Sequence, residues 1–273
     1  MAAPNGVRSF FKLTDRAKPT DVIIAGVGRG EEIPVMRGYW PRARIIGVEP
    51  LEEHWQWMRK VNVEPDVLIR GALYHKDGET LTFHLNYEPD QRATIYDLPV
   101  EVKDEITREV GTISLDRIAE TYGPISNALL WLDVEGAEAD AMRGSELLES
   151  GAIRWVNCEL NICPPRNCPP WAEVNELLES LGFKMFALHS VTRNGRQADA
   201  IYIRADTWKG KRIAMAQRGL QRKLERLAAG RGRTRQKYRN LDGALLHATQ
   251  PTNGDRLHTG EARLEASPGQ GPA

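Results

Sequence analysis

The chain has 273 residues, a formal net charge of zero, 41% hydrophobic residues and 27% charged residues. This balance is typical of a globular protein and excludes a fibrous or wholly disordered chain. No window approaches the roughly 18 consecutive apolar residues that are needed to cross a bilayer. The N-terminal segment lacks the apolar stretch and small-residue cleavage site of a secretory signal, so we expect a cytoplasmic protein.

Charge is unevenly distributed along the chain. From Trp208 onward there are 14 Lys and Arg against 5 Asp and Glu, a net charge of +9, so the preceding part carries −9. The basic residues are concentrated before residue 240, and the sequence then becomes rich in Gly, Pro and Thr. We therefore expect four parts: an N-terminal lead segment 1–19, an α/β domain 20–207, a basic helical tail 208–240 and a disordered tail 241–273.

The basic tail has a narrow apolar stripe if it is helical, formed by Ile213, Leu220, Leu224 and Leu227. Such a helix could bind nucleic acid, an anionic membrane surface, or the acidic body of the same protein or of its partner. Aromatic residues are nearly absent from it, so stacking on bases is poorly supported. A solvated helix with no partner is an equally good interpretation.

Short β-branched runs alternate with segments of helical period over residues 20–207, which predicts a mostly parallel sheet covered by helices. The expected parallel strands are 20–26, 44–50, 66–73, 127–136 and 152–160. One helix is expected after each of the first, second, fourth and fifth strands. In the helix after the second strand, Leu51, Trp55 and Met58 predict the buried face. Runs 184–191 and 198–204 flank an Asn-Gly turn and predict an antiparallel hairpin.

The order is interrupted after the third strand. A turn at Asp77-Gly78 precedes apolar residues at alternate positions, Leu81, Phe83 and Leu85, which predict a hairpin with one buried face. The following stretch, 87–110, has little periodicity. We expect it to be a loop or lid.

A glycine-rich turn follows the first strand, with Gly26, Gly28 and Gly30, and the second strand ends at Glu49. Glycines let a backbone approach a ligand closely, and an acid at this distance suits the hydroxyls of a ribose. Nicotinamide dinucleotides and S-adenosylmethionine both fit this pattern. A dinucleotide site needs a sixth-position glycine, where Glu31 would repel phosphates, so the pattern favours S-adenosylmethionine. An ordinary tight turn remains the alternative.

Acidic residues follow two of the later strands. Asp133 and Glu135 are two positions apart, so a continued strand would place both carboxylates on one side. Such acids are costly to bury unless they bind an ammonium group, a hydroxyl or a metal. Glu159 is a third candidate of this kind. The alternatives are that Glu135 only caps the next helix and that Glu159 pairs with an arginine.

The three cysteines, Cys158, Cys163 and Cys168, recur every five residues. An odd number fits a reducing compartment and argues against a disulfide framework. The spacing lacks the C-x-x-C pair that binds zinc, so we expect no metal site. The neighbouring prolines predict a rigid loop above the sheet, near the place where a substrate that accepts a transferred group would bind.

Several runs together resemble the FkbM-type methyltransferases, a branch of the class I S-adenosylmethionine-dependent fold. They are IIAGVGRGEE, IIGVEPLEEH, GALYHKDGETLTFH, TISLDRI and LLWLDVEGAEADAMRG, and the resemblance covers about residues 20–205. It implies a Rossmann-like sheet of seven mostly parallel strands with an antiparallel C-terminal hairpin and helices on both faces. It also implies S-adenosylmethionine as cofactor and O-methylation of hydroxyls on sugars, lipids or secondary metabolites.

The resemblance also implies roles for matching positions. Gly26, Gly28 and Gly30 would accept the methionine part of the cofactor and Glu49 its ribose, while Ala72 and Leu73 would flank the adenine and Asp133 would bind the amino group. One position departs from the class I pattern, because Ile24 stands where an acid is common. Either Asp133 or Glu32 then meets the cofactor's ammonium group, or cofactor affinity is reduced.

Methyl transfer to an alcohol needs a well-positioned acceptor and a general base. We expect Glu135 to be that base, with Asp133, Glu159 and two histidines as the other candidates. His54 is expected on the exposed face of its helix. His84 is expected on the outer face of the hairpin, with the alternative that it points into the loop that admits substrate. The alternative function is a weak or inactive cofactor-fold scaffold whose basic tail binds nucleic acid or an anionic surface.

Overall fold

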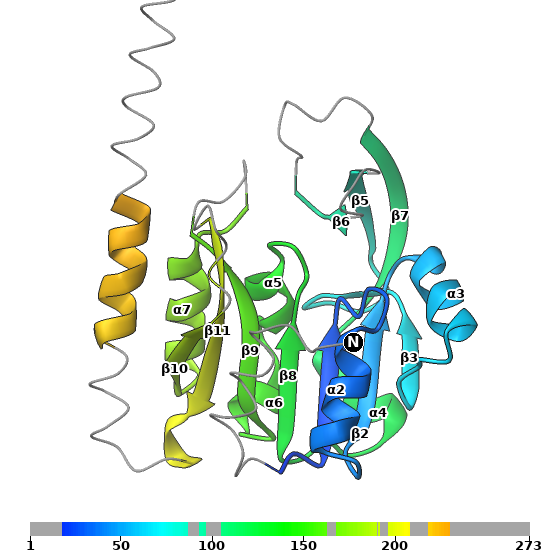
Figure 1. The fold of residues 1–273 in the computed structure, drawn as a ribbon, viewed down its shortest axis with the longest axis horizontal. Helices are drawn as coiled ribbons and strands as arrows, with labels where there is room; N and C mark the ends of the chain where they lie inside the picture. Colours follow the sequence, from blue (N-terminus) through cyan, green and yellow to red (C-terminus); the bar gives the residue numbers. More distant parts are fainter. Residues whose placement is uncertain are drawn as a thin grey trace, which may run out of the picture. The chain divides into compact units, whose positions relative to one another are not determined.

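The computed structural model describes residues 18–86, 93–96, 105–162, 168–189, 191, 196–207 and 218–229. Its main sheet has seven strands in the order β10-β11-β9-β8-β1-β2-β3 (Figure 1). They are β1 (Asp21–Ala25), β2 (Arg44–Glu49), β3 (Val67–Arg70), β8 (Ala128–Leu132), β9 (Ile153–Asn161), β10 (Phe183–His189) and β11 (Gln197–Arg204). Strand β11 runs antiparallel to both β9 and β10, whereas the other pairs are parallel. The predicted fold class is therefore confirmed.

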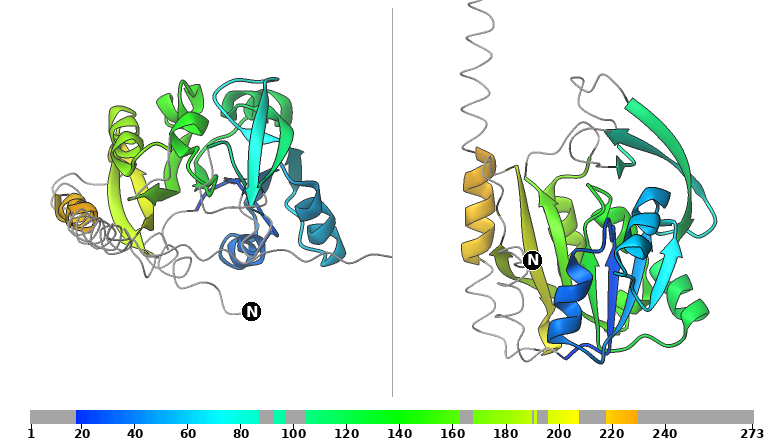
Figure 2. Two further views of the ribbon diagram at one scale, coloured as in Figure 1. Left: turned by 90° about the horizontal axis from the view of Figure 1, so that it is seen from above. Right: turned by 45° about the vertical axis from the view of Figure 1, so that its right-hand side comes forward.

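Side chains alternate across the buried strands and fill two separate apolar layers. In β1, Val22 and Ile24 enter one layer while Ile23 and Ala25 enter the other, and all four are at most 1% exposed. The first layer lies under α2 (Glu32–Tyr39) and α3 (Glu52–Lys60). The second lies under α4 (Leu115–Tyr122), α5 (Glu138–Met142), α6 (Glu146–Glu149) and α7 (Trp171–Ser180). Figure 2 shows α2 and α7 on opposite faces of the sheet.

A second, four-stranded sheet rises beyond the carboxyl ends of the main strands (Figure 1). Its order is β4-β7-β5-β6, with β4 (Ala72–Leu73), β5 (Thr80–Asn86), β6 (Ala93–Thr94) and β7 (Glu105–Ile113). The single strand predicted over 66–73 is thus wrong, because the chain passes from one sheet to the other at Gly71. A Cβ there would lie 2.8 Å from the carbonyl oxygen of Gly111, so the close approach of β7 requires glycine.

The prediction of a loop or lid over 87–110 is also wrong in part. Strand β7 pairs antiparallel with β5 over seven residues, with Val110 opposite Leu81 and Ile106 opposite Leu85. Val110 is buried but Ile106 is 41% exposed, so the strand lacks the apolar alternation by which it could have been recognised. The remainder of this stretch, apart from residues 93–96, lies outside the described residues.

Two short helices, α5 and α6, replace the single helix expected after β8. The side chain of Asp116, in α4, accepts hydrogen bonds from the backbone N–H groups of Glu146 and Leu147, both at 3.0 Å. This carboxylate therefore caps α6 from another helix, at the end where a negative charge is favoured. The contact gives the LDRI run a structural role that the sequence analysis did not assign.

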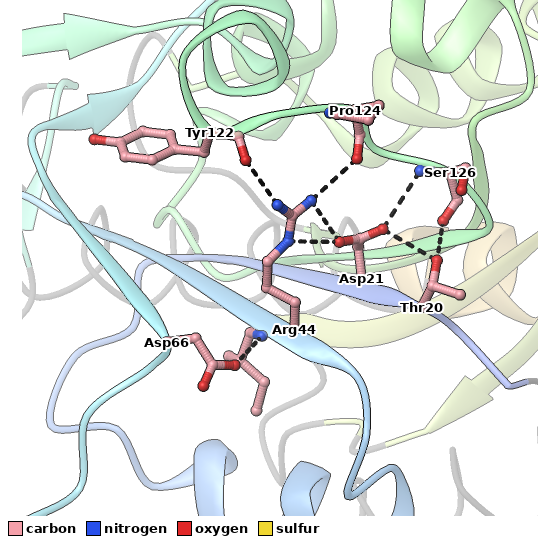
Figure 3. A network of polar contacts seen from close by, with 8 residues as sticks. Thr20, Asp21, Arg44, Asp66, Tyr122, Pro124 and Ser126 are labelled. Atoms are coloured by element: carbon pink, nitrogen blue, oxygen red, sulfur yellow. Dashed lines mark hydrogen bonds and ion pairs between the residues drawn. The ribbon is translucent and has the colours of Figure 1, made fainter.

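A polar network ties the strands together at their amino ends, opposite the second sheet (Figure 3). The Arg44 guanidinium donates to Asp21 at 2.8 Å and to the carbonyl oxygens of Tyr122 and Pro124 at 2.7 and 3.1 Å. Asp21 is buried, and Arg44 provides the charge that offsets its loss of water. The network connects β1 and β2 to the segment that enters β8.

The basic tail contains a helix at residues 218–229. Leu224 is fully buried in the second layer, and Leu220 and Leu227 pack against the same layer. The side chain of Gln221 donates to Glu179 of α7 at 2.9 Å. Three residues of the predicted apolar stripe therefore pack within the protein, while Ile213 lies outside the described residues. Basic side chains cover the exposed side: Arg218, Arg222, Lys223 and Arg226. No helix in the described ranges has the length and apolarity to span a bilayer.

Candidate functional site

A cavity opens where the carboxyl ends of β1, β2 and β8 meet the second sheet. Its polar side consists of residues that follow the main strands: Gly26, Gly28, Glu49, Leu51, His54, Asp133 and Glu135. Its apolar side includes Ala72, Leu73, Leu81, Phe83, Ala93 and Ile95. The structure thus brings together most of the predicted site residues. Gly30 and Glu159 do not line this cavity. His54 was predicted only as a candidate base, and the apolar residues Leu81, Phe83, Ala93 and Ile95 were not predicted to line the site.

The glycine turn packs directly on the turn that follows β8. Gly26 has φ +76°, and a Cβ there would lie 1.8 Å from the carbonyl oxygen of Asp133. The two turns are also joined by a 3.0 Å hydrogen bond from the Asp133 N–H to the Ala25 carbonyl. Glycine is therefore required at position 26 by close approach as well as by a left-handed backbone.

Glu49 is buried, with 3% of the residue exposed, and its carboxylate has three donors. Oε2 accepts the Gly28 N–H at 2.7 Å, and Oε1 accepts the Leu51 N–H at 2.9 Å. The third partner is His54 Nδ1, 3.0 Å from Oε1. A carboxylate offers about four acceptor positions, so one position on Oε2 remains for a ligand donor.

The predicted exposed position of His54 is wrong. The residue is only 8% exposed, its Nδ1 lies 3.0 Å from Glu49 Oε1, and it lines the cavity. The buried face of α3 contains His54 and Met58, one turn apart, and the hydrogen bond to Glu49 offsets the cost of burying an imidazole. His84 is half-buried on β5 and is not among the residues that form the cavity wall.

Glu135 reaches the cavity by a different route from the one predicted. Strand β8 ends at Leu132, so strand alternation does not place Asp133 and Glu135 on one side. Instead Glu135 has φ +50°, and its carbonyl oxygen accepts a 2.8 Å hydrogen bond from the Thr94 hydroxyl. A non-glycine residue in this conformation costs about 1–3 kcal/mol, and such strain is common at functional sites. Both carboxylate residues still line the cavity.

A second side-chain contact connects the segment that follows β6 to α5. The hydroxyl of Tyr96 donates to the carboxylate of Asp140 across 44 positions of sequence. Burial and this negative neighbour raise the pKa of Tyr96. Together with the bond from Thr94 to Glu135, the contact fixes the second sheet over the acidic turn.

Buried and half-buried carboxylates surround this acidic turn. Burial, with Asp133 and Glu135 adding repulsion, raises the pKa of Glu138 to about 8 and that of Glu159 to about 10. Burial also raises the pKa of Glu32 to about 7, with Asp133 adding to the effect. Glu159 accepts a 2.7 Å hydrogen bond from Gln197, not from the arginine considered as its partner. A Glu159 that keeps its proton at neutral pH is poorly suited to act as a general base.

Replacing Glu138 by glutamine is expected to stabilise the protein at alkaline pH. The pKa of Glu138 in the folded protein, about 8, lies above the value of 4.5 expected in the unfolded chain. This carboxyl therefore favours folding at low pH and loses that contribution as pH rises from 4.5 through 8. Gln keeps an acceptor for the Gly136 N–H. We expect Glu138→Gln to raise the free energy of unfolding at pH 9 by up to about 5 kcal/mol, because each pKa unit between 4.5 and about 8 is worth about 1.4 kcal/mol, with little change at pH 4.5.

Urea unfolding at pH 4.5 and pH 9 measures this effect. The matched control is Glu149→Gln, because Glu149 is exposed at the end of α6. A Glu138→Gln variant whose stability changes between these two pH values by the same amount as that of the wild type would contradict the prediction.

The two described cysteines are free thiols and are both buried. Burial raises the pKa of Cys158 well above its usual value and that of Cys168 to about 12, so neither is a reactive thiolate at neutral pH. Cys163 lies outside the described residues. Within the described ranges, no group of three His, Cys, Asp or Glu side chains is placed to hold a metal ion.

Comparison with known proteins gives one family match. Residues 26–185 match the model of the methyltransferase FkbM domain. A search of curated proteins finds no match to this sequence.

Among solved structures, the chain is similar to an S-adenosylmethionine-dependent methyltransferase from Aquifex aeolicus, with 11% identity, a TM-score of 0.37 and coverage of 72% of this chain and 88% of that one. Magnesium protoporphyrin IX methyltransferase from Synechocystis, solved with bound S-adenosylmethionine, is 14% identical, with a TM-score of 0.38 and coverage of 73% of this chain and 76% of that one. Fibrillarin from Aeropyrum pernix, also solved with S-adenosylmethionine, is 13% identical, with a TM-score of 0.39 and coverage of 68% of this chain and 67% of that one.

Proposed function

Because this chain belongs to the FkbM methyltransferase family, we propose that it transfers the methyl group of S-adenosylmethionine to a hydroxyl of a sugar, glycan or small metabolite. The observation that carries the proposal is the buried carboxylate of Glu49, which keeps one acceptor position open beside a glycine turn and a cavity. A ribose hydroxyl is a donor of the kind that this position accepts.

The cavity residues fit the proposed cofactor. Ala72, Leu73 and Phe83 form an apolar wall that suits an adenine ring. At Gly28 no atom lies within 4 Å of the position that a Cβ would take, so the backbone is open to a ligand.

Asp133 is the group best placed to receive the cofactor's amino group. Ile24, at the position where related folds have an acid, is 1% exposed in the core and offers no charge. Of the two candidates to replace that acid, Asp133 lines the cavity and Glu32 does not. The raised pKa of Glu32, about 7, further reduces its negative charge at neutral pH.

The cofactor, when bound, supplies an electrophilic methyl carbon on a sulfonium, which a hydroxyl oxygen attacks as the carbon–sulfur bond breaks. The chain's part is to hold the acceptor in line and to accept the hydroxyl proton. We assign proton acceptance to Glu135, because it lines the cavity on a strained, anchored turn. Leu81, Phe83 and Ile95 contribute apolar surface to the wall of the same cavity.

Methyl transfer is tested by incubating the protein with isotope-labelled S-adenosylmethionine and a panel of sugars, glycans and hydroxylated metabolites. Mass spectrometry should detect an acceptor that gains one labelled methyl group. Glu49→Ala should weaken S-adenosylmethionine binding by about 10–100-fold, the value of a hydrogen bond to a charged group. Glu52→Ala, an exposed residue of α3, is the control that should bind normally.

If the wild-type protein does not bind S-adenosylmethionine in calorimetry, the enzyme proposal is overturned. The scaffold alternative would then gain support, with the exposed basic side of helix 218–229 as the surface for nucleic acid or another anionic partner.

A further inference from the structure

His54 lies beside the carboxylate that we assign to the ribose, and both residues line the cavity. Its Nδ1 is 3.0 Å from Glu49 Oε1, and both residues are buried. We propose that His54 is a positioning residue, which holds the Glu49 carboxylate so that Oε2 is the oxygen that receives the sugar hydroxyl. The inference rests on the proposed function, because it names a second residue of the same cofactor site.

The hydrogen bonds around Glu49 decide which oxygen is open. Oε1 has two donors, the Leu51 N–H and His54, and these fill its acceptor positions. Oε2 has one donor, the Gly28 N–H. Without His54, Oε1 would have a vacant position on the side away from the glycine turn, and the carboxylate would lose a restraint on its rotation.

The tautomer of His54 follows from its partner. An ionised carboxylate only accepts hydrogen bonds, so Nδ1 must carry a proton. The ring is then a donor toward Glu49 whether it is neutral or charged. An asparagine places an amide nitrogen close to the position of Nδ1, whereas a glutamine reaches farther, toward Nε2. These two substitutions therefore separate the two ring nitrogens.

Other contacts hold the first turn of α3 in place independently of His54. Trp55 Nε1 donates to the Glu49 carbonyl oxygen at 2.7 Å. Arg108 of β7 forms a 2.6 Å ion pair with Glu53. Because the turn is attached at these points, substitution of His54 is expected to change the carboxylate more than the backbone.

Calorimetry with two ligands tests the proposal: S-adenosylhomocysteine and its analogue without the 2′ and 3′ hydroxyls. His54→Leu should weaken binding of the hydroxylated ligand about tenfold, the loss of about one hydrogen bond to a charged group. Its affinity for the dideoxy ligand should stay within about twofold of the wild type, because no ribose hydroxyl then contacts Glu49. A structural defect would weaken both ligands equally.

Rescue and coupling complete the test. His54→Asn should bind the hydroxylated ligand within about threefold of the wild type, whereas His54→Gln should not. In Glu49→Gln, adding His54→Leu should cause little further loss, since both changes act on one interaction. Gln56→Leu, on the exposed side of the same helix, should bind as the wild type does.

Three results would overturn the assignment. They are equal losses for both ligands, unchanged binding in His54→Leu, and rescue by glutamine instead of asparagine, which would indicate direct contact through Nε2. A wild-type protein that binds neither ligand would overturn the proposed function itself, an outcome distinct from these three.

Discussion

Replacement of Glu135 by glutamine is expected to lower kcat by about 10²–10⁴-fold, the usual contribution of a general base. The change keeps the size of the side chain and the anchored backbone turn, so the dissociation constant of S-adenosylmethionine should stay within about threefold. Rates measured at saturating cofactor with an acceptor found by mass spectrometry give kcat, and calorimetry gives the dissociation constant.

Glu159→Gln is the matched control for that experiment. The raised pKa of Glu159, about 10, keeps its carboxyl neutral at pH 7, and glutamine resembles the neutral form. Activity at pH 7 should therefore be close to that of the wild type. If Glu159→Gln loses activity while Glu135→Gln keeps it, the general base is Glu159 and our assignment is wrong.

Gly26→Ala is expected to have the largest effect of any single methyl group added to the site. Its Cβ would lie 1.8 Å from the Asp133 carbonyl oxygen, and the left-handed backbone at φ +76° adds strain. The turns after β1 and β8 must then separate. We expect a loss of roughly 3 kcal/mol or more in the free energy of unfolding, together with at least about tenfold weaker cofactor binding.

Urea unfolding and calorimetry measure the two effects of Gly26→Ala. Gly38→Ala is the comparison, because Gly38 lies in α2, has an ordinary backbone and has no atom within 4 Å of its Cβ position. Alanine there should be neutral or stabilise the helix by up to about 1 kcal/mol. Wild-type stability in Gly26→Ala would show that the glycine turn can move without cost.

The parts of the fold that follow from local pattern could be predicted. The run that forms β8 is apolar at every position and the run that forms β1 is apolar after Asp21, as expected for strands covered on both faces. The strand pair β10 and β11 flanks a turn signal. The features that were missed depend on distant partners. Strand β7 is defined by its pairing with β5, and the break at Gly71 arises from contact with Gly111.

In the candidate site, too, the residues set by local sequence pattern could be predicted and those set by distant partners could not. Gly26 and Glu49 could be identified because each ends a strand, and parallel strands bring such residues to one edge. His54 could not be placed, because helical periodicity does not show that its partner would be the buried Glu49. The hydrogen bond from the Thr94 hydroxyl to the Glu135 carbonyl oxygen could not be predicted either. The two residues are 41 positions apart, and β6 is too short to recognise in the sequence.

The packing of helix 218–229 and the position of β11 have a consequence for how the protein can be divided. The segment that identifies the family ends at residue 185, in the middle of β10, while β11 lies between β10 and β9. A fragment limited to residues 26–185 would lack two interior strands, β1 and β11, and would uncover the apolar surface beneath Leu224. The smallest piece suited to expression and crystallisation therefore extends to residue 229, well past the boundary that sequence comparison draws.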